Sequence, residues 1–203
     1  MSTVRLGIYG GTFDPPHIGH VGAARDFIEK MRLDRLLIIP TCIPPHKARD
    51  TDVTPEERLH MCTLAFGDIP GVTVSDMELS RGGKSYTSDT LTELSAESVG
   101  KIFMLIGTDM FLTLESWHCP EVIFRLSHIC LARRENDEML RRAVEEKIRL
   151  YTEKYGAEIT VIDREATELS SSDIRAAISR GDVPLGLVPG RVLDYINKQG
   201  LYR

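Results

Sequence analysis

Two histidines stand three residues apart shortly after a pair of glycines, in the stretch from Gly10 to His20. An apolar run over residues 4–9 precedes this stretch and is typical of a buried strand, and apolar residues recur at helical spacing after it. Gly10 and Gly11 let the backbone approach a ligand closely and adopt φ values that side chains forbid. The first helical turn favours an anion, and His17 and His20 would project to one side of it. The stretch therefore predicts a site for phosphate chemistry.

A run of serines before a late helix is the second place where the sequence could hold an anion. Ser170, Ser171 and Ser172 precede Arg175, which lies about one helical turn further on. A helix cap needs only one hydroxyl, and Ser170 with Asp173 already has the spacing of a capping box. The other hydroxyls, the helix N-terminus and the guanidinium can together cradle a phosphate.

A short basic loop follows the second apolar run of the chain. His46 and Lys47 come directly after two prolines, which stiffen the loop and limit how far both side chains can move. Lys47 would act on a phosphate as a flexible point charge. An exposed turn that happens to be basic is the alternative for this segment taken alone.

Two further segments have both a functional and a structural interpretation. Gly107 ends a strongly apolar run and allows close approach of a ligand, while Asp109 could accept hydrogen bonds from ribose hydroxyls or help to hold a metal ion. Trp117 is the only tryptophan and, taken alone, is typical of a core residue. Thr87 or Ser88 is expected to be the N-cap of a helix, and a well-capped helix suffices to explain that segment.

Alternating strand and helix patterns must position these side chains. Strands are expected over residues 4–9, 35–40, 72–75, 101–107, 128–132 and 158–162. Helices are expected near residues 18–31, 55–67, 88–97, 137–154, 172–180 and 189–198. This alternation predicts an α/β fold with a doubly wound, mainly parallel sheet and helices on both faces. In such sheets ligands bind beyond the carboxyl ends of the strands, where Gly10 and Gly107 lie in sequence.

Composition limits the classes of protein and partner. The chain has 203 residues, enough for a full hydrophobic core. Its net charge of −5 argues against bulk attraction to nucleic acid or anionic membranes, so a phosphate site must be local. Four cysteines are scattered without a Cys-x-x-Cys pair, which favours reduced thiols. With no signal peptide and no membrane-spanning run, we expect a cytoplasmic protein with neither nucleic-acid nor membrane partners.

The stretch from Gly10 to His20 resembles the HxGH signature of the nucleotidylyltransferase superfamily, in the form found in bacterial nicotinate mononucleotide adenylyltransferases. The similarity extends over nearly the whole chain. Further matching segments are Pro44–Lys47, Ser85–Leu91, Gly107 to Trp117 and Leu169–Arg175. The chain departs from the family at Ser172, where the family has threonine, and at Arg133-Arg134-Glu135, where it often has Arg-Pro-Gly.

This resemblance implies a Rossmann-like fold, a single domain over residues 1–203 with a small helical C-terminal part from about residue 168, and adenylyl transfer. ATP and nicotinate mononucleotide would give nicotinic acid adenine dinucleotide and pyrophosphate by direct in-line attack on the α-phosphorus. The implied catalytic residues are His17, His20 and Arg175. The implied ATP-binding residues are Gly10, Gly11, Thr12, Phe13, Gly107, Asp109, Ser171 and Ser172. The implied mononucleotide-binding residues are His46, Lys47, Tyr86, Thr87, Trp117 and Arg133, with the choice between Arg133 and Arg134 left open.

The same resemblance implies Mg²⁺ as cofactor, held mainly by ATP phosphates and water because the sequence offers no carboxylate cage. It also implies preference for nicotinate over nicotinamide mononucleotide, since a carboxylate gains more than a carboxamide from a helix N-terminus. Whether the chain forms a homo-oligomer stays open.

Three alternatives have weaker support. Phosphopantetheine adenylyltransferases share the first and last motifs but lack the segment from Ser85 to Leu91. Class I aminoacyl-tRNA synthetases share His-Ile-Gly-His but need a Lys-Met-Ser-Lys-Ser-like loop and an RNA-binding domain. A nucleotide sensor without catalysis would leave two separate phosphate cradles unexplained.

Overall fold

The computed structural model describes residues 4–45, 51–97, 100–133, 137–163, 169–183 and 185–203. The chain divides into two compact units. Unit 1 comprises residues 1–9, 26–36 and 86–167, and unit 2 comprises residues 10–25, 37–85 and 168–203. The single domain expected over residues 1–203 stays a prediction.

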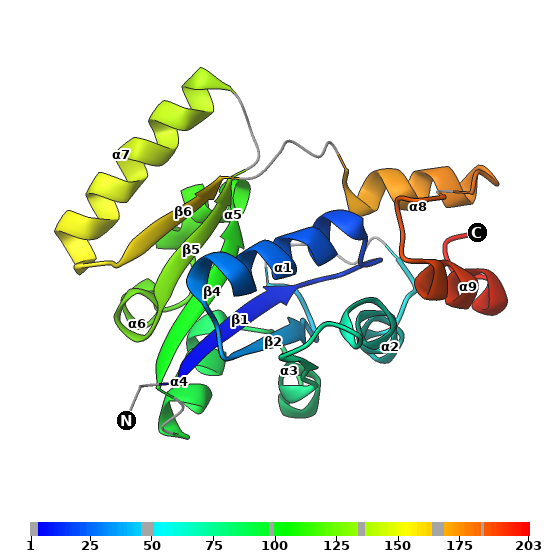
Figure 1. Ribbon diagram of the computed structural model, residues 1–203, viewed down its shortest axis with the longest axis horizontal. Helices are drawn as coiled ribbons and strands as arrows, with labels where there is room; N and C mark the ends of the chain where they lie inside the picture. The colour runs from blue at the N-terminus through cyan, green and yellow to red at the C-terminus, as the bar shows by residue number, and fades with distance from the viewer. Residues whose placement is uncertain (1–3, 46–50, 98–99, 134–136, 164–168, 184) are drawn as a thin grey trace. The chain divides into compact units, whose positions relative to one another are not determined.

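The strands are β1 (Arg5–Gly11), β2 (Arg35–Pro40), β3 (Val72–Val74), β4 (Lys101–Gly107), β5 (His128–Arg133) and β6 (Ile159–Asp163). They form one six-stranded sheet in the order β3-β2-β1-β4-β5-β6. β4 runs parallel to β1 and to β5, and β5 runs parallel to β6 (Figure 1). The strand order reverses between β1 and β4, which is the doubly wound, Rossmann-like arrangement. The predicted fold class is confirmed.

The helices are α1 (Ile18–Met31), α2 (Pro55–Phe66), α3 (Met77–Arg81), α4 (Thr87–Ala96), α5 (Thr108–Thr113), the 3₁₀ turn η1 (Leu114–Ser116), α6 (Pro120–Leu126), α7 (Glu138–Tyr155), α8 (Ser171–Ser179) and α9 (Gly190–Gln199). Every helix that the sequence predicts is present, with both ends within one residue of the prediction. No helix in the described part of the chain has the length and hydropathy of a membrane span.

Four short elements, α3, α5, η1 and α6, were not predicted from the sequence. These elements have 5, 6, 3 and 7 residues, too short for a 3.6-residue period to emerge from a window of 11 or more. α5, η1 and α6 connect β4 to β5, and a parallel pair of strands always needs such a crossover. The need for a crossover between two parallel strands, rather than a local pattern of apolar residues, was the signal that could have predicted helices between β4 and β5.

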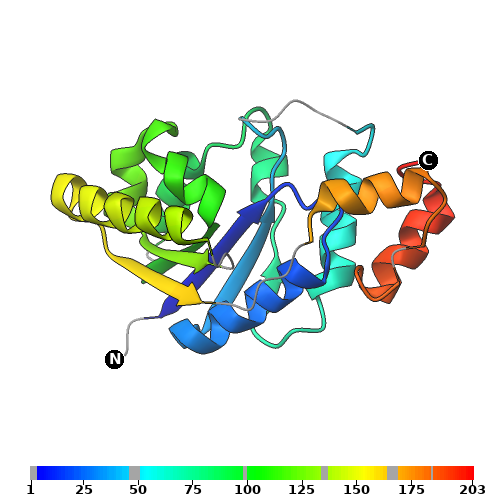
Figure 2. The same cartoon turned by 90° about the horizontal axis from the view of Figure 1, so that it is seen from above.

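The core of unit 1 lies between the sheet and the helices that follow β4. Residues 102–106 of β4 are all buried, as a central parallel strand requires. Tyr151 of α7 is completely buried, and its hydroxyl donates to the carbonyl oxygen of Phe111 in α5 at 3.0 Å. Figure 2 shows α7 running along α5 and α6. This packing supports the strand ends that carry Gly107 and Arg133.

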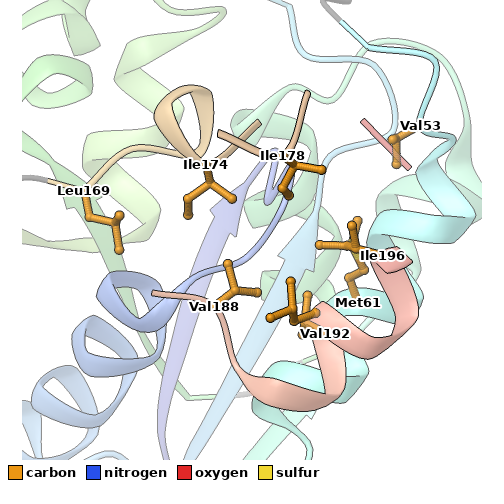
Figure 3. Close-up of a cluster of buried hydrophobic side chains, with 9 residues drawn as sticks. Val53, Met61, Leu169, Ile174, Ile178, Val188, Val192 and Ile196 are labelled. Carbon is orange, nitrogen blue, oxygen red and sulfur yellow. The ribbon is translucent and has the colours of Figure 1, made fainter. Parts of the chain in front are cut away.

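The core of unit 2 joins α2 to the last part of the chain (Figure 3). Its buried residues are Val53, Met61, Leu169, Ile174, Ile178, Val188, Val192, Leu193 and Ile196. α2 begins with a complete capping box between Thr54 and Glu57, and α9 ends at Gly200 with φ 68°. This cluster fixes α8, and therefore the serine run at its start.

Candidate active site

The two histidines lie together in unit 2, with His17 directly before α1 and His20 in its first turn. Their rings stack with centroids 3.7 Å apart and planes 27° apart, so both lie on one side of the turn as predicted. The main-chain N–H of His17 donates to Nδ1 of His20 at 3.2 Å. A neutral His20 therefore carries its proton on Nε2, which makes Nε2 the donor towards a ligand. The side chain of His17 is 4% exposed, while His20 is half-buried.

Gly19, between the two histidines, makes room for the ring of His17. A Cβ atom at position 19 would lie 3.0 Å from Cε1 and from Nδ1 of that ring. Such contacts are tighter than ordinary packing allows, so any larger residue would displace the imidazole. The glycine of the motif thus serves the geometry of His17.

Of the two roles expected for Gly10 and Gly11, the structure supports close approach of a ligand at Gly10 but shows no unusual φ at either glycine. Neither Gly10 nor Gly11 has a positive φ, and the left-handed residue of this loop is Phe13, with φ 50°. A Cβ atom on Gly10 would meet nothing closer than 4.0 Å, so a ligand can approach the backbone there. A Cβ atom on Gly11 would lie 3.1 Å from the ring of Phe13. That ring is 2% exposed and packs edge-on against His20, which leaves Phe13 only its main chain for a ligand.

The serine run and Arg175 contact the loop that leads to the histidines, within the same unit. The hydroxyl of Ser171 donates to the carbonyl oxygen of Pro15 at 2.9 Å, and Nη1 of Arg175 donates to that of Asp14 at 2.8 Å. Nη2 of Arg175 lies 3.2 Å from the hydroxyl oxygen of Ser172. These hydrogen bonds therefore join the start of α8 to the loop before the histidines, although the two segments are about 155 residues apart in the chain.

Ser170 is the N-cap of α8, as the capping-box spacing predicts. Its side chain accepts a hydrogen bond from the main-chain N–H of Asp173 at 3.1 Å and donates to the carboxylate of Asp173 at 2.6 Å. The first two N–H groups of the helix belong to Ser171 and Ser172. They lie at the helix N-terminus, which is the positive end of the helix dipole. α8 can therefore accept an anion at its N-terminus.

Arg58 is buried and contacts the loop after β1, a position that the sequence pattern does not predict. It is 3% exposed, yet it lies in the first turn of α2. Nη1 donates to the carbonyl oxygen of Thr12 at 2.8 Å, while Nη2 donates to those of Thr41 and Cys42 at 2.7 and 3.1 Å. Arg58 thus ties the loop after β1 to the loop after β2.

Unit 1 carries four of the residues expected at the mononucleotide, namely Tyr86, Thr87, Trp117 and Arg133. Tyr86, and not Thr87 or Ser88, is the N-cap of α4, so that expectation was wrong, and Tyr86 makes no side-chain capping bond. The ring of Tyr86 packs on that of His118 with centroids 4.3 Å apart. Trp117, directly before His118, is half-exposed rather than a core residue. These aromatic residues therefore gather near the start of α4.

The other expected ligands have different surroundings. Gly107 is exposed and is the N-cap of α5, and a Cβ atom there would meet nothing within 4 Å. Asp109 is exposed in the first turn of the same helix. Arg133 pairs with the largely exposed carboxylate of Asp163, with Nε to Oδ1 at 2.7 Å, so binding a phosphate would compete with this ion pair. His46, Lys47 and Arg134 lie outside the described residues.

Comparisons with known proteins match most of the chain. A cytidylyltransferase-like family model matches residues 8–177. A protein of Desulfatibacillum aliphaticivorans named "Probable nicotinate-nucleotide adenylyltransferase" is 37% identical over 225 residues, covering 98% of this chain and 100% of that protein. One of Lachnoclostridium phytofermentans with the same name is 35% identical over 202 residues, covering 98% of each.

Solved structures share the fold. The chain is similar to Plasmodium falciparum nicotinic acid mononucleotide adenylyltransferase complexed with NaAD, with a TM-score of 0.76 and 18% identity, covering 98% of this chain and 97% of that one. For the same protein complexed with APC the TM-score is 0.72.

Proposed function

This chain belongs to the cytidylyltransferase-like family and, within it, to the nicotinate-nucleotide adenylyltransferases, and we propose that it joins ATP to nicotinate mononucleotide in NAD biosynthesis. The products are nicotinic acid adenine dinucleotide and pyrophosphate. The observation that carries the proposal is the pair of hydrogen bonds from Ser171 and Arg175 to the carbonyl oxygens of Pro15 and Asp14. They hold a second set of phosphate-binding groups against the loop that leads to His17.

The reaction is a direct displacement at the α-phosphorus. An oxygen of the mononucleotide phosphate forms a bond to that phosphorus, the bond to the bridging oxygen of the β-phosphate breaks, and pyrophosphate leaves with the electron pair. The attacking phosphate is already an anion, so no nucleophilic side chain is required. Catalysis then consists of positioning and of stabilising charge that develops in the transition state.

The histidine motif acts at the α-phosphate. His20 donates from Nε2, because its Nδ1 accepts the main-chain N–H of His17. His17 donates beside it from the stacked ring. Both donors are fixed by the start of α1 before substrate binds, so little reorganisation accompanies the reaction.

The start of α8 acts on the departing pyrophosphate. The N–H groups of Ser171 and Ser172 and the guanidinium of Arg175 are donors that an anion at a helix N-terminus uses. Arg175 is already oriented by its bond to Asp14. The ATP nucleoside is assigned to the main chain of Gly10, Gly11, Thr12 and Phe13 and to Gly107 and Asp109.

Mg²⁺, when bound with ATP, supplies neutralisation of phosphate charge. Among the described residues, no three His, Cys, Asp or Glu side chains gather into a group that could hold a metal ion. This donor set fits an ion held by ATP oxygens and water, and the residues proposed here act on the phosphates themselves.

The nicotinate ring is assigned to the start of α4. The side chain of Tyr86 makes no capping bond there, so it does not compete with a substrate carboxylate for the N–H groups of Thr87 and Ser88. Tyr86, Thr87 and Trp117 would enclose the pyridine ring, and His46, Lys47 and Arg133 would hold the mononucleotide phosphate. A carboxylate gains a charge-assisted hydrogen bond and a favourable dipole interaction that a carboxamide lacks.

The proposal predicts the order of acceptors for ATP. Because a hydrogen bond to a charged group contributes about 1.5–3 kcal/mol, nicotinate mononucleotide should exceed nicotinamide mononucleotide in kcat/KM by roughly 10- to 100-fold. Phosphopantetheine should support no turnover. Pyrophosphate release, measured in a coupled assay with each acceptor in turn, gives this order. Equal rates with the two mononucleotides would refute the placement of the carboxylate at α4, and turnover with phosphopantetheine alone would refute the function.

We place the reaction in the cytoplasm. The cysteines Cys42, Cys62, Cys119 and Cys130 are all free thiols, which fits a reducing compartment. Burial raises the pKa of Cys62 and of Cys130, so these two thiols are poor nucleophiles and belong to the core. Small molecules, rather than nucleic acid or a membrane, are the proposed partners.

A further inference from the structure

Asp14 connects the histidine motif to two distant parts of unit 2. It is 9% exposed, and its two carboxylate oxygens accept hydrogen bonds from two different hydroxyls. Tyr202 donates to Oδ1 at 2.6 Å, and Thr51 donates to Oδ2 at 2.7 Å. Since a buried carboxylate is costly without donors, these bonds fix the side chain of Asp14 in one orientation.

Tyr202 is the penultimate residue of the chain and is held firmly. It follows Gly200, the left-handed C-cap of α9, and itself adopts φ 65°. Tyr202 is partly buried and packs against the core cluster of unit 2. Burial, followed by the carboxylate of Asp14, raises the pKa of Tyr202, so the phenol stays protonated and acts as a donor.

Only two prolines separate Asp14 from His17. Pro15 and Pro16 restrict the backbone between them, and the carbonyl oxygen of Pro15 is also bound by the hydroxyl of Ser171. A shift of Asp14 would therefore be transmitted to the ring of His17, which has little room because it packs on His20. Along the path from Tyr202 through Asp14, Pro15 and Pro16 to His17, only His17 is assigned to the substrate chemistry.

We propose that Tyr202 is a positioning residue for adenylyl transfer: its hydroxyl, acting through the carboxylate of Asp14, holds the loop that carries His17. This inference rests on the proposed function and adds to it a role for the end of the chain. Displacing a catalytic group by about 1 Å can lower the reaction rate far more than the loss of one hydrogen bond alone would suggest. Because His17 acts on the transition state, loss of the Tyr202 hydroxyl should lower kcat and leave KM unchanged.

The test replaces the hydroxyl and keeps the ring. Tyr202→Phe should lower kcat for ATP and nicotinate mononucleotide about 10-fold, with KM for both substrates within about 2-fold of wild type. Tyr195→Phe is the matched control, because Tyr195 packs against the same core cluster and contacts the ring of His60, outside the site. It should match wild type in kcat. An unchanged kcat in Tyr202→Phe would overturn the inference, and so would an equal loss in Tyr195→Phe.

A double-mutant cycle shows whether Tyr202 acts through Asp14. In an Asp14→Ala background, Tyr202→Phe should cost less than 2-fold further in kcat, because the group it acts on is already gone. A full 10-fold loss in that background would overturn the inference, since the two effects would then be independent.

Hydrogen exchange separates this inference from the proposed function. The peptide covering residues 10–20 should exchange faster in Tyr202→Phe and unchanged in Tyr195→Phe, whether or not the assay substrates are correct. If wild type releases no pyrophosphate from ATP and nicotinate mononucleotide, the function fails, but faster exchange still supports the link. If residues 10–20 exchange at the same rate in Tyr202→Phe as in wild type, the proposed link between Tyr202 and the His17 loop is overturned, even if wild type catalyses the reaction.

Discussion

Replacing His20 with alanine should lower kcat by about 10²- to 10³-fold while the protein stays folded, because removing one preorganised donor to a developing oxyanion typically costs that much. His20 is half-buried, and its ring makes edge contact with Phe13 and stacks on His17. The truncation therefore removes the Nε2 donor without opening the core. A coupled pyrophosphate assay at saturating ATP and nicotinate mononucleotide measures the loss.

His60→Ala is the matched control for His20→Ala. His60 lies on α2 of the same unit, and its ring contacts that of Tyr195 with centroids 4.6 Å apart and planes 52° apart. The variant therefore loses an imidazole and an aromatic contact outside the site. Its kcat should stay within about 2-fold of wild type. Turnover of His20→Ala close to that of His60→Ala would reject the role of His20.

Replacing Arg58 with methionine should give the largest loss of stability in unit 2. Methionine fills much of the same volume, but the carbonyl oxygens of Thr12, Thr41 and Cys42 lose a charged donor. A buried acceptor without a partner costs about 1–3 kcal/mol, so we expect a loss of about 3 kcal/mol in the free energy of unfolding. For a chain of this length that corresponds to a fall in Tm of roughly 6 to 12 °C. Urea denaturation followed by circular dichroism measures it.

Arg191→Met shows whether the loss comes from the buried contacts. Arg191 pairs with Asp68 at 2.9 Å, but both side chains are largely exposed, and such pairs contribute about 0–1 kcal/mol. It should therefore lower the free energy of unfolding by less than about 1 kcal/mol. If Arg58→Met were as stable as Arg191→Met, the three hydrogen bonds of Arg58 would not hold the two loops.

The features of the fold and of the site that the sequence predicts correctly are the long helices and strands and the motifs made of neighbouring residues. β4 is a continuous apolar run and α1 has a sustained helical period, so both were placed correctly from local pattern alone. The histidine pair was also predictable, because three-residue spacing on a helical turn has only one geometry.

Contacts between distant side chains and main-chain atoms were not predictable in the same way. Arg58 binds three carbonyl oxygens, and every peptide has such an oxygen, so no partner residue type marks the contact in the sequence. The bond between Tyr202 and Asp14 joins residues 188 apart, and only the packing of α9 brings them together.

The glycine motif illustrates a different limit. A Gly-Gly pair suggests positive φ, yet the left-handed residue is Phe13, and the role of Gly11 is to leave space for the ring of Phe13. Steric room for a neighbouring ring and freedom of φ both select glycine, and a sequence does not distinguish them. The same holds for Gly19 beside His17.

The stereochemical course at the α-phosphorus tests the central claim most directly, namely that the mononucleotide phosphate attacks ATP without an enzyme-bound intermediate. The substrate is ATP with one sulfur and one isotopically labelled oxygen on the α-phosphorus, and the configuration of the resulting nicotinic acid adenine dinucleotide is determined by NMR. A single in-line displacement predicts inversion of configuration. Retention would require two displacements through a side chain, and it would contradict the account of His17, His20 and Arg175 as donors alone.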